Sequence, residues 1–552
     1  MSTWTGQPSV KGSSESMRMI FLTCVSIGIT FTWGVEMTYC TPYLLSLGLT
    51  KGQTSMVWLA GPISGMIVQP IIGVIADRSR SRWGRRRPVI VIGSVIVALS
   101  LLTLGFTKEL VAYFVSDKSL ARGVTIFLAV LTICSVDFSI NAVMSCARSL
   151  VVDTLPIHKQ QVGAAWASRM GSLGHIIGYG MGALDLVQLF GPTLGDTQFK
   201  QLTVIAALGM LATSGITCWA VSERVLITAR HEPRGGQGPF KVVHQIWSTI
   251  ITLPPRIRGI CYAVFWSWIG WFPFIIYSST WVGETYFRYN VPPNVDTKDA
   301  LGDMGRIGST ALTVYSTVAF ISAWVLPPFI RAPEDDTFTH RPPASIARWV
   351  ELFNKVKPDL LTAWVASHIV FAFTMAMTPF ASSFRVATLL VALCGIPWSI
   401  VMWAPSTFMG IEVNKLSGSP DLVLGSQPNG GAHHQRRRST ASSIELLRLE
   451  HGDSHVPGSP TATGPVGSTG ELSGIYFGIM NIYTTIPQLI STLMSTVVFG
   501  FLEPGKSPEL AHDAHPSEQA NTDGPNAIAV CMFLGAISSC IAAVVTKKLK
   551  YL

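Results

Sequence analysis

The sequence predicts an all-α membrane protein that crosses the bilayer as twelve helices. Hydrophobic residues make up 48% of its 552 residues, charged residues only 13%, and the mean hydropathy is +0.41. A soluble domain carries about 25% charged residues. The apolar residues also gather in runs of about 20 residues, the length that a helix needs to span a membrane. Composition and run length together favour an integral membrane protein.

Twelve apolar runs satisfy the length rule, and they define the expected domain organisation. The expected spans are 19–41, 54–76, 88–107, 123–146, 162–187, 202–221, 259–280, 308–330, 360–378, 384–407, 474–500 and 526–546. The expected units are a tail at 1–18, a six-helix half at 19–221, a joining loop at 222–258, a second six-helix half at 259–546 and a tail at 547–552.

Lysine and arginine are distributed unevenly between the loops on the two sides of the membrane. The side that holds both termini carries about 28 of them and the other side about ten, so the positive-inside rule places both termini in the cytoplasm. The net charge of +9 comes mostly from these loops. It therefore does not indicate a nucleic-acid partner.

The segment 412–472, within the second half, is rich in Gly, Ser, Pro and His and poor in apolar residues. Such a composition cannot bury a core, so we expect a disordered cytoplasmic loop. The arginines 436–438 precede Ser439. This pattern suits a kinase that prefers basic sequences or a contact with lipid head groups. A solvated linker is the alternative.

The fourth span combines an acid, an amide and a base within an apolar run. Asp137, Asn141 and Arg148 follow each other at offsets of four and eleven, which bring them onto one face of a helix. A charge in the bilayer core costs at least ~2.5–3.5 kcal/mol, so such groups usually have a function. The pattern predicts a polar lining of a cavity. The alternative is an Asp–Arg pair that only locks two helices together.

The sequence offers no motif that indicates an enzyme. The nine cysteines lack the spacing of metal ligands, and we find no phosphate-binding loop, His-x-x-x-His cluster or nucleophile elbow in a soluble segment. We therefore expect neither enzyme activity nor a metal site nor a cofactor.

The loop after the second span, 73–88, reads GVIADRSRSRWGRRRP. Carboxylates and arginines at helix ends can exchange partners between two arrangements of a bundle, because bidentate pairs are strong yet local. We expect this loop to act as a gating latch together with Asp153 at the end of the fourth span. The latch residues are Gly73, Asp77, Arg78, Arg82, Arg85 and Arg86. The alternative is an anchor that serves the positive-inside rule alone.

This loop resembles the signature loop of the major facilitator superfamily. Its version of the motif, Ser-Arg-Trp-Gly-Arg-Arg-Arg-Pro, is typical of a smaller group within that superfamily. The sequence is similar to the sucrose/proton symporters of the glycoside–pentoside–hexuronide:cation symporter group, closest to the fungal α-glucoside branch. The fourth-span spacing of Asp137, Asn141, Arg148 and Asp153 matches the group. Further resemblance lies at 34–49, 166–185, 267–284 and 395–412. It implies two six-helix halves that are pseudo-symmetric.

The resemblance implies that Asp137 couples sugar movement to protons, and Glu36, which could relay the proton, is the second candidate. Burial raises the affinity of an acid for its proton, which fits this role for Asp137. A structural ion pair of Glu36 with Arg148 or Arg169 is the alternative. His175 stands where many relatives have Asn, and Met480 precedes Asn481 where fungal relatives usually have His.

A sugar needs polar groups for its hydroxyls and aromatic faces for its C–H surfaces. We expect the site between the two halves, near the middle of the membrane. The expected contacts are Arg148, Asn141, Tyr39, Trp33, Trp166, His175, Asn481, Gln488 and Trp403. Taken singly, most of the aromatic residues are equally typical of a core or of a membrane interface.

The sequence therefore predicts proton-coupled import of sucrose- or maltose-type α-glucosides by alternating access. A non-transporting membrane sugar sensor or scaffold, or an exporter of another solute, is the alternative. The expected partners are the sugar, protons and the bilayer, with a kinase acting near Ser439 as a further candidate. The resemblance favours the plasma membrane, and the vacuolar membrane stays open.

Overall fold

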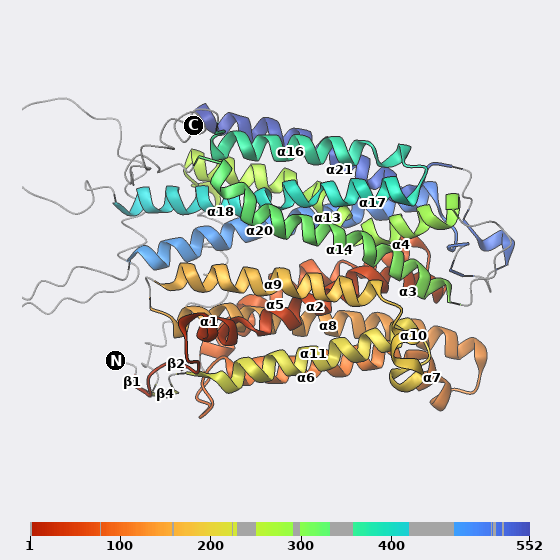
Figure 1. The fold of residues 1–552 in the computed structure, drawn as a ribbon, viewed down its shortest axis with the longest axis horizontal. Helices are drawn as coiled ribbons and strands as arrows, with labels where there is room; N and C mark the ends of the chain where they lie inside the picture. Colours follow the sequence, from red (N-terminus) through yellow and green to blue (C-terminus); the bar gives the residue numbers. More distant parts are fainter. Residues whose placement is uncertain are drawn as a thin grey trace, which may run out of the picture.

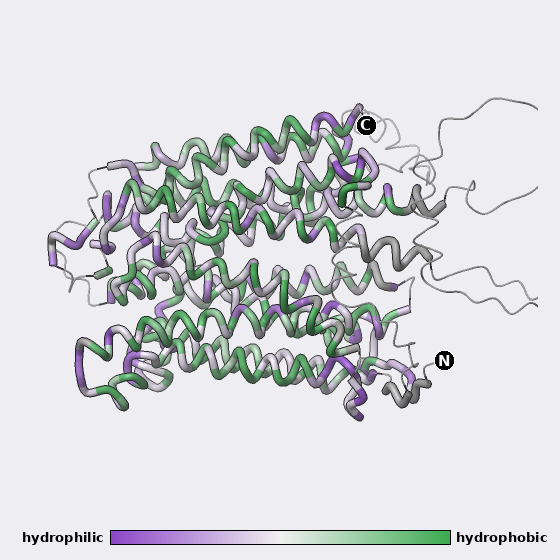
Figure 2. The backbone as a smooth tube through the Cα atoms, turned by 180° about the vertical axis from the view of Figure 1, so that it is seen from behind, coloured by the Kyte–Doolittle hydropathy of each residue, from purple (hydrophilic) through white to green (hydrophobic). Residues whose placement is uncertain are grey.

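A computed structural model describes most of the chain. The described residues are 3–77, 79–156, 159–223, 225–228, 250–290, 299–331, 357–418, 468–508, 510–511, 515–520 and 524–551. The helices run along one long axis, and both chain ends lie at the same end of the bundle (Figure 1). We call this the terminal end and the opposite one the far end. Hydrophilic segments gather toward the two ends and hydrophobic segments between them (Figure 2).

The first half contains the helices and short strands up to residue 228. The helices are α1 (Glu15–Thr23), α2 (Val25–Val35), η1 (Glu36–Cys40), α3 (Thr41–Ser46), α4 (Lys51–Val57), α5 (Ala60–Asp77), α6 (Arg87–Gly105), α7 (Thr107–Phe114), α8 (Lys118–Thr154), α9 (Gln160–Ala183), α10 (Leu186–Phe190), η3 (Gly191–Leu194) and α11 (Gln198–Ala220). The strands are β1 (Thr3–Thr5), β2 (Ser9–Val10), β3 (Val221–Ser222) and β4 (Val225–Thr228).

The second half contains the remaining helices. They are α13 (Pro255–Asn290), α14 (Ala300–Phe329), α16 (Leu360–Ala376), η4 (Thr378–Phe380), α17 (Phe384–Leu393), α18 (Gly395–Gly418), α20 (Ser468–Leu502), η6 (Pro516–Glu518), α21 (Ala527–Lys548) and η7 (Leu549–Tyr551). The halves meet where α9 lies against α14 and where α4 and α5 lie against α20.

The expected number of membrane crossings is confirmed. Within the described residues, ten helices are long and apolar enough to cross a membrane, and two bent pairs raise the number to twelve. The first bent pair joins Glu15–Thr23 to Val25–Ser46 at 41°, and the second joins Val162–Ala183 to Leu186–Leu194 at 79°. All twelve expected spans overlap one of these segments.

The expected N-terminal tail contains structure that the sequence did not reveal. Strand β1 pairs antiparallel with β4, and β2 pairs antiparallel with β3, so these two strands of the N-terminal segment lie against the start of the joining loop. Helix α1 then begins at Glu15. Most of 222–258 and residues 419–467, with Ser439, lie outside the described residues, and so do the expectations placed on them.

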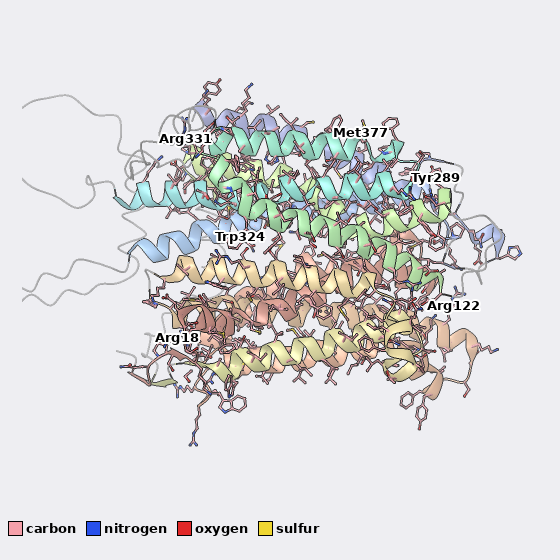
Figure 3. The ribbon with its side chains drawn as sticks, viewed as in Figure 1. Arg18, Arg122, Tyr289, Trp324, Arg331 and Met377 are labelled. Carbon is pink, nitrogen blue, oxygen red and sulfur yellow. The ribbon has the colours of Figure 1, made fainter. Side chains whose placement is uncertain are left out.

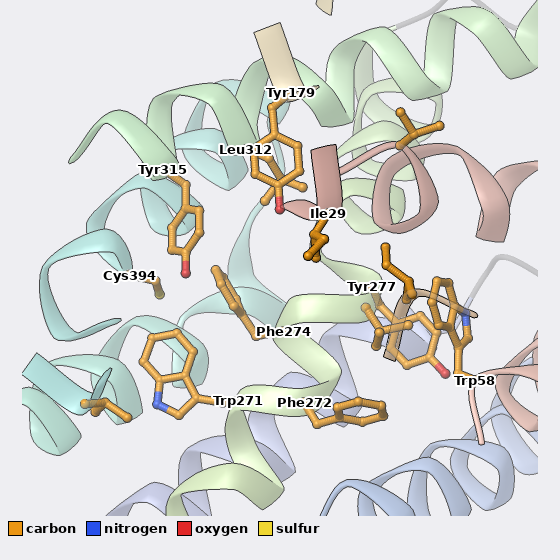
Figure 4. Packing of buried hydrophobic residues seen from close by; sticks show 14 of the residues in the cluster. Ile29, Trp58, Tyr179, Trp271, Phe272, Phe274, Tyr277, Leu312, Tyr315 and Cys394 are labelled. Carbon is orange, nitrogen blue, oxygen red and sulfur yellow. The ribbon is translucent and has the colours of Figure 1, made fainter. Parts of the chain in front are cut away.

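The core of the second half is built from stacked aromatic rings. Trp271 stacks on Phe371 with ring centroids 3.9 Å apart and meets Trp398 edge-on at 5.0 Å. Figure 4 shows Trp271 with Phe274 beside it, and the two rings meet edge-on at 5.5 Å. Such pairs favour these offset and edge-on geometries.

Helices α13 and α21 approach each other closely through glycine. A Cβ atom added at Gly270 would lie 2.6 Å from the carbonyl oxygen of Gly535, which is shorter than any normal contact. A small residue at this crossing is therefore required, as is common between membrane helices.

Candidate functional site

The first span contains a π-helical turn, η1, that begins at Glu36. Pro42 lies at the start of α3, directly after this turn. Because proline has no N–H, the carbonyl of Thr38 loses its helical hydrogen bond, and the helix widens. Single π-helical turns of this kind occur often at functional sites. The predicted proton-coupling acid Glu36 thus lies where the backbone departs from an α-helix.

Asp137 and Asn141 lie on the face of α8 that packs against α5, as their spacing predicted. The amide of Asn141 donates to the hydroxyl of Ser64 at 2.7 Å and to the carbonyl of Asp137 at 2.9 Å. Its oxygen accepts a hydrogen bond from Gln69 at 2.9 Å. In this conformation Asn141 therefore bonds only within the first half.

Glu36 and Asp137 form a pair of buried acids on neighbouring helices, because α8 packs against α2, which ends directly before Glu36. They are 3% and 4% exposed. One carboxylate oxygen of each is buried without a hydrogen-bond partner. Within the part of the chain that the structure describes, neither acid pairs with a lysine, arginine or histidine. The alternative pairing of Glu36 with Arg148 or Arg169 is therefore wrong for this conformation.

Arg148 lies apart from the acid pair. It is exposed, and a nitrogen of its guanidinium lies 2.9 Å from the sulfur of Met144. Eleven residues separate it from Asp137, which corresponds to about 16 Å along the helix toward the terminal end. The spacing placed both groups on one face, but their distance along the axis prevents a direct Asp–Arg pair.

The predicted sugar contacts differ in how deeply they are buried. Tyr39 is fully buried, and its hydroxyl donates to the carbonyl of Gly182 at 2.7 Å. His175 stacks on Tyr179 with centroids 5.5 Å apart. Asn481 is exposed. The partly buried contacts are Trp33, Trp166, Trp403 and Gln488.

At the terminal end, the structure brings three of the predicted latch residues together as a cluster. Arg85 and Arg86 contact Asp153 at 2.7 and 3.0 Å. Arg82 is exposed. Gly73 has no atom within 4 Å of where a Cβ would lie. Arg78 and the side chain of Asp77 lie outside what the structure describes.

Glu223 is a component of this cluster that the sequence analysis missed. It is buried, and its carboxylate accepts the backbone N–H groups of Arg85, Arg86 and Arg87 at 2.8, 2.9 and 2.8 Å. These three N–H groups lie just before and at the first residue of α6. The start of a helix favours a negative charge beside it. The only sequence signal was an acid directly after an apolar span.

A second charged cluster lies at the far end and joins the two halves. Lys51 of α4 contacts Glu284 of α13 at 2.7 Å and also pairs with Glu503, which directly follows α20. Arg288 lies 3.0 Å from Glu503, and Asn526 donates to Glu284 at 2.9 Å. We call these five residues the far-end cluster. The side chains of Lys51, Glu284 and Glu503 are at most 6% exposed.

A further pair reinforces the far end. Arg306 of α14 pairs with Asp185 at the bend of the fifth span and with Asp303. Asp185 is 41% exposed although paired. Ser55, one turn beyond Lys51, donates to the carbonyl of Thr492 at 3.2 Å.

An apolar crevice of about 360 Å³ lies elsewhere, toward the terminal end of the second half, between α14, α16 and α18. Its walls include Phe329, Val370 and Ile400, with Lys357 at one side. A sugar site needs several polar groups that converge. This crevice does not provide them, and it lies in the half without the acid pair.

Comparison with known proteins gives one family and a consistent set of relatives. Residues 22–266 match the family described as MFS/sugar transport protein. The chain is 29% identical to a general alpha-glucoside permease of Schizosaccharomyces pombe, over 96% of this chain and 93% of the relative. It is 24% identical to a sucrose transport protein of Oryza sativa subsp. indica, over 91% of this chain and 86% of the relative.

Solved structures share the fold at low identity. The nucleoside transporter NupG, as its D323A mutant, aligns with a TM-score of 0.54 and 11% identity over 96% of this chain and 99% of its own. A D-xylose-proton symporter aligns with a TM-score of 0.52 and 11% identity over 96% and 97%. At this identity the likeness describes the architecture.

Proposed function

We propose that this chain is a multi-pass sugar transporter of the major facilitator superfamily, and that it imports sucrose- and maltose-type α-glucosides together with protons. The names of the relatives, an alpha-glucoside permease and sucrose transport proteins, support this class of sugar. The buried pair of Glu36 and Asp137 supports the coupling to protons.

The acid pair carries the proposal. Two carboxylates enclosed near each other, without a cation, cannot both stay ionised, because desolvation and mutual repulsion both oppose it. The pair therefore holds a proton in this conformation. When water reaches the site, the cost of ionisation falls and the proton can leave. Coupling of proton movement to sugar movement requires acids that are enclosed in one conformation and hydrated in the other, and this pair meets that requirement.

The ion pairs suggest which conformation the structure represents. Lys51 with Glu284 and Glu503, and Arg306 with Asp185, connect the two halves at the far end. The pairs of Arg85 and Arg86 with Asp153, and of Arg256 with Glu412, stay within one half at the terminal end. This difference fits a transporter closed at the far end.

We place the terminal end in the cytoplasm, because the positive charge is concentrated there. The far-end cluster is then the outer gate, and the present conformation releases sugar inside. In the other conformation Lys51 must separate from both glutamates. The plasma membrane is our proposed location.

The proposed cycle uses the predicted residues in order. From outside, sugar and proton enter while the far end is open, and protonation of Asp137 permits closure around the sugar. Arg148, Asn141 and the exposed Asn481 are the proposed polar contacts, with Trp166 and Trp403 as aromatic faces. After the terminal end opens, the proton and the sugar leave. The Arg85–Arg86–Asp153 group stabilises the first half during this change.

Labelled sucrose and maltose uptake into proteoliposomes, with and without an imposed pH gradient, tests the proposal. Wild type should accumulate sugar only with the gradient. Asp137→Asn should lose accumulation but keep sugar exchange between the two sides, because exchange needs no net proton movement. Undiminished gradient-driven accumulation in Asp137→Asn would reject the coupling role. Absence of uptake for any sugar in folded wild type would favour the sensor or the exporter.

A further inference from the structure

Arg169 is an unexplained charge inside the fifth span. It lies about 10 Å beyond the start of that span, counted along α9 from Val162. Among the described residues, no acid pairs with it and no acceptor receives a hydrogen bond from it. Its guanidinium instead lies 5.2 Å from the ring of Trp166, one turn earlier, and 4.6 Å from the ring of Trp324.

The two rings come from different halves of the molecule. Trp166 belongs to α9. Trp324 belongs to α14 and is labelled in Figure 3. The indole of Trp324 is 54% exposed. Arg169 therefore lies at the seam between the halves, beside an indole that stays more than half exposed although Phe320 also lies next to it, with ring centroids 6.4 Å apart.

The contacts with the two tryptophan rings do not offset the cost of burying the charge of Arg169. A cation in the membrane carries a desolvation cost, and contacts with aromatic faces return only part of it. A guanidinium also has five N–H donors in a fixed planar arrangement, which here find no described acceptor. The missing partner must offer several acceptors and an apolar face. Neighbouring hydroxyls and the C–H surface of a sugar meet both conditions.

Resting on the proposed function, we propose that Arg169 and Trp324, with Trp166, form a subsite for the transported glucoside at the seam. Arg169 donates to sugar hydroxyls, and the indole of Trp324 covers a C–H face of the same ring. The subsite is complete only while α9 and α14 are adjacent. Sugar bound there therefore favours the conformations in which these helices meet.

The position agrees with that of Arg148. Arg148 lies about 9 Å from the end of α8 at Thr154, and Arg169 about 13 Å from the start of α9 at Gln160. The two helices contact each other, and both of these helix ends belong to the terminal end. Arg148 donates only to the sulfur of Met144 among the described residues. Two arginines at similar depth, each with donors left over, can hold two parts of a disaccharide.

Uptake kinetics of Arg169 variants test the subsite. Arg169→Gln should raise the KM for the transported sugar about tenfold or more, which is the usual effect of losing a hydrogen bond to a charged group. Arg169→Lys should keep part of the affinity, since the charge remains without the planar arrangement of donors. Trp324→Leu should raise KM about fivefold and Trp324→Phe less, because a ring face remains.

Deoxy sugars separate contact from mere structural support. In wild type, removing the hydroxyl that Arg169 contacts should weaken uptake about tenfold, whereas in Arg169→Gln the same removal should have little further effect. Trp219→Leu is the matched control, since Lys11 lies 4.1 Å above the Trp219 ring in another cation–π pair. Its KM should stay unchanged.

The outcomes distinguish the two proposals. If wild type takes up no glucoside, the proposed function fails. If wild type transports sugar but the deoxy series loses the same factor in wild type and Arg169→Gln, the subsite is wrong. In that case Arg169 is only a clamp between the halves.

Discussion

The two ends of the bundle use the same chemistry for different purposes. At the far end, Lys51 bridges from the first half to Glu284 and Glu503 of the second, with all three side chains nearly enclosed. At the terminal end, Arg86 contacts Asp153 within the first half, and Asp153 is 25% exposed.

The difference follows from where each charge finds its partner. A buried pair is strongly destabilised when one member is removed, because the other is left charged and unpaired. A partly exposed pair contributes little, because water screens both members. The far-end cluster can therefore hold two halves together, whereas the terminal-end pairs mainly order one half.

The largest expected effect follows from removing the central cation of the far-end cluster. Lys51→Met leaves Glu284 and Glu503 enclosed with less compensation, so closure at the far end should weaken by about 3–5 kcal/mol. The measurement is labelling of a Ser55→Cys variant by an impermeant thiol reagent added on the side of the far end. Labelling should become much faster. A Tyr113→Cys variant, 85% exposed, gives the reference rate. Equal Ser55→Cys labelling in both backgrounds would contradict a gate.

A smaller effect is expected at the terminal end. Glu223→Ala removes the acceptor of three backbone N–H groups at the start of α6, which should lower the free energy of unfolding by about 1–2 kcal/mol. Thermal unfolding in detergent measures this change. Glu412→Ala is the control. That residue pairs with Arg256 at 3.2 Å and Lys415 at 3.0 Å, and both cations are well exposed, so the loss should stay below about 1 kcal/mol.

The second bridge at the far end should matter less than Lys51. Asp185→Asn removes the charge that pairs with Arg306 but keeps the oxygen that caps the N–H of Gln188. Because Asp185 is 41% exposed, the loss should be at most about 1 kcal/mol. Labelling of Ser55→Cys should rise only slightly. An increase equal to that of Lys51→Met would show that burial does not decide the difference.

The smallest effect concerns external pH. Burial raises the pKa of Glu503, whereas the positive charges of Lys51 and Arg288 lower it. The lowering by the charges is larger than the increase from burial, so the pKa lies below the ordinary value of 4.5. A group with a depressed pKa stabilises the closed form above its ordinary pKa and loses this effect as the pH falls through the lowered one. Labelling of Ser55→Cys should therefore not change between pH 7 and pH 5. It should rise below about pH 4.5, and less so in Glu503→Gln. A rise already near pH 6 would contradict this.

The sequence identified both acids, Asp137 and Glu36, but not that they lie near each other. Asp137 and Asn141 face α5 because an offset of four residues places them on one side of a helix, which follows from local geometry. That Asp137 lies near Glu36, one hundred residues earlier, depends on how α8 packs beside the first span. Arg148 shares a face with Asp137 yet lies too far along the axis to pair with it.

The missed residues all have partners that are distant in sequence. Lys51 and Glu503 are 452 positions apart, and Lys51 and Glu284 are 233 apart. In the sequence, each appears as a single charge at the edge of an apolar segment, which is typical of any membrane helix. Arg169 was visible as a charge inside a span, but its contact with Trp324 depends on how the halves meet.

The sequence by itself determined the twelve crossings, the excess of positive charge on one side and the acid within the fourth span. Each follows from the cost of placing polar groups in lipid, which acts on every short segment separately. Only the tertiary structure decided that Lys51 joins the halves and that Arg169 lies between two tryptophans. Those contacts depend on which helix faces pack together, and that choice is made by the whole bundle.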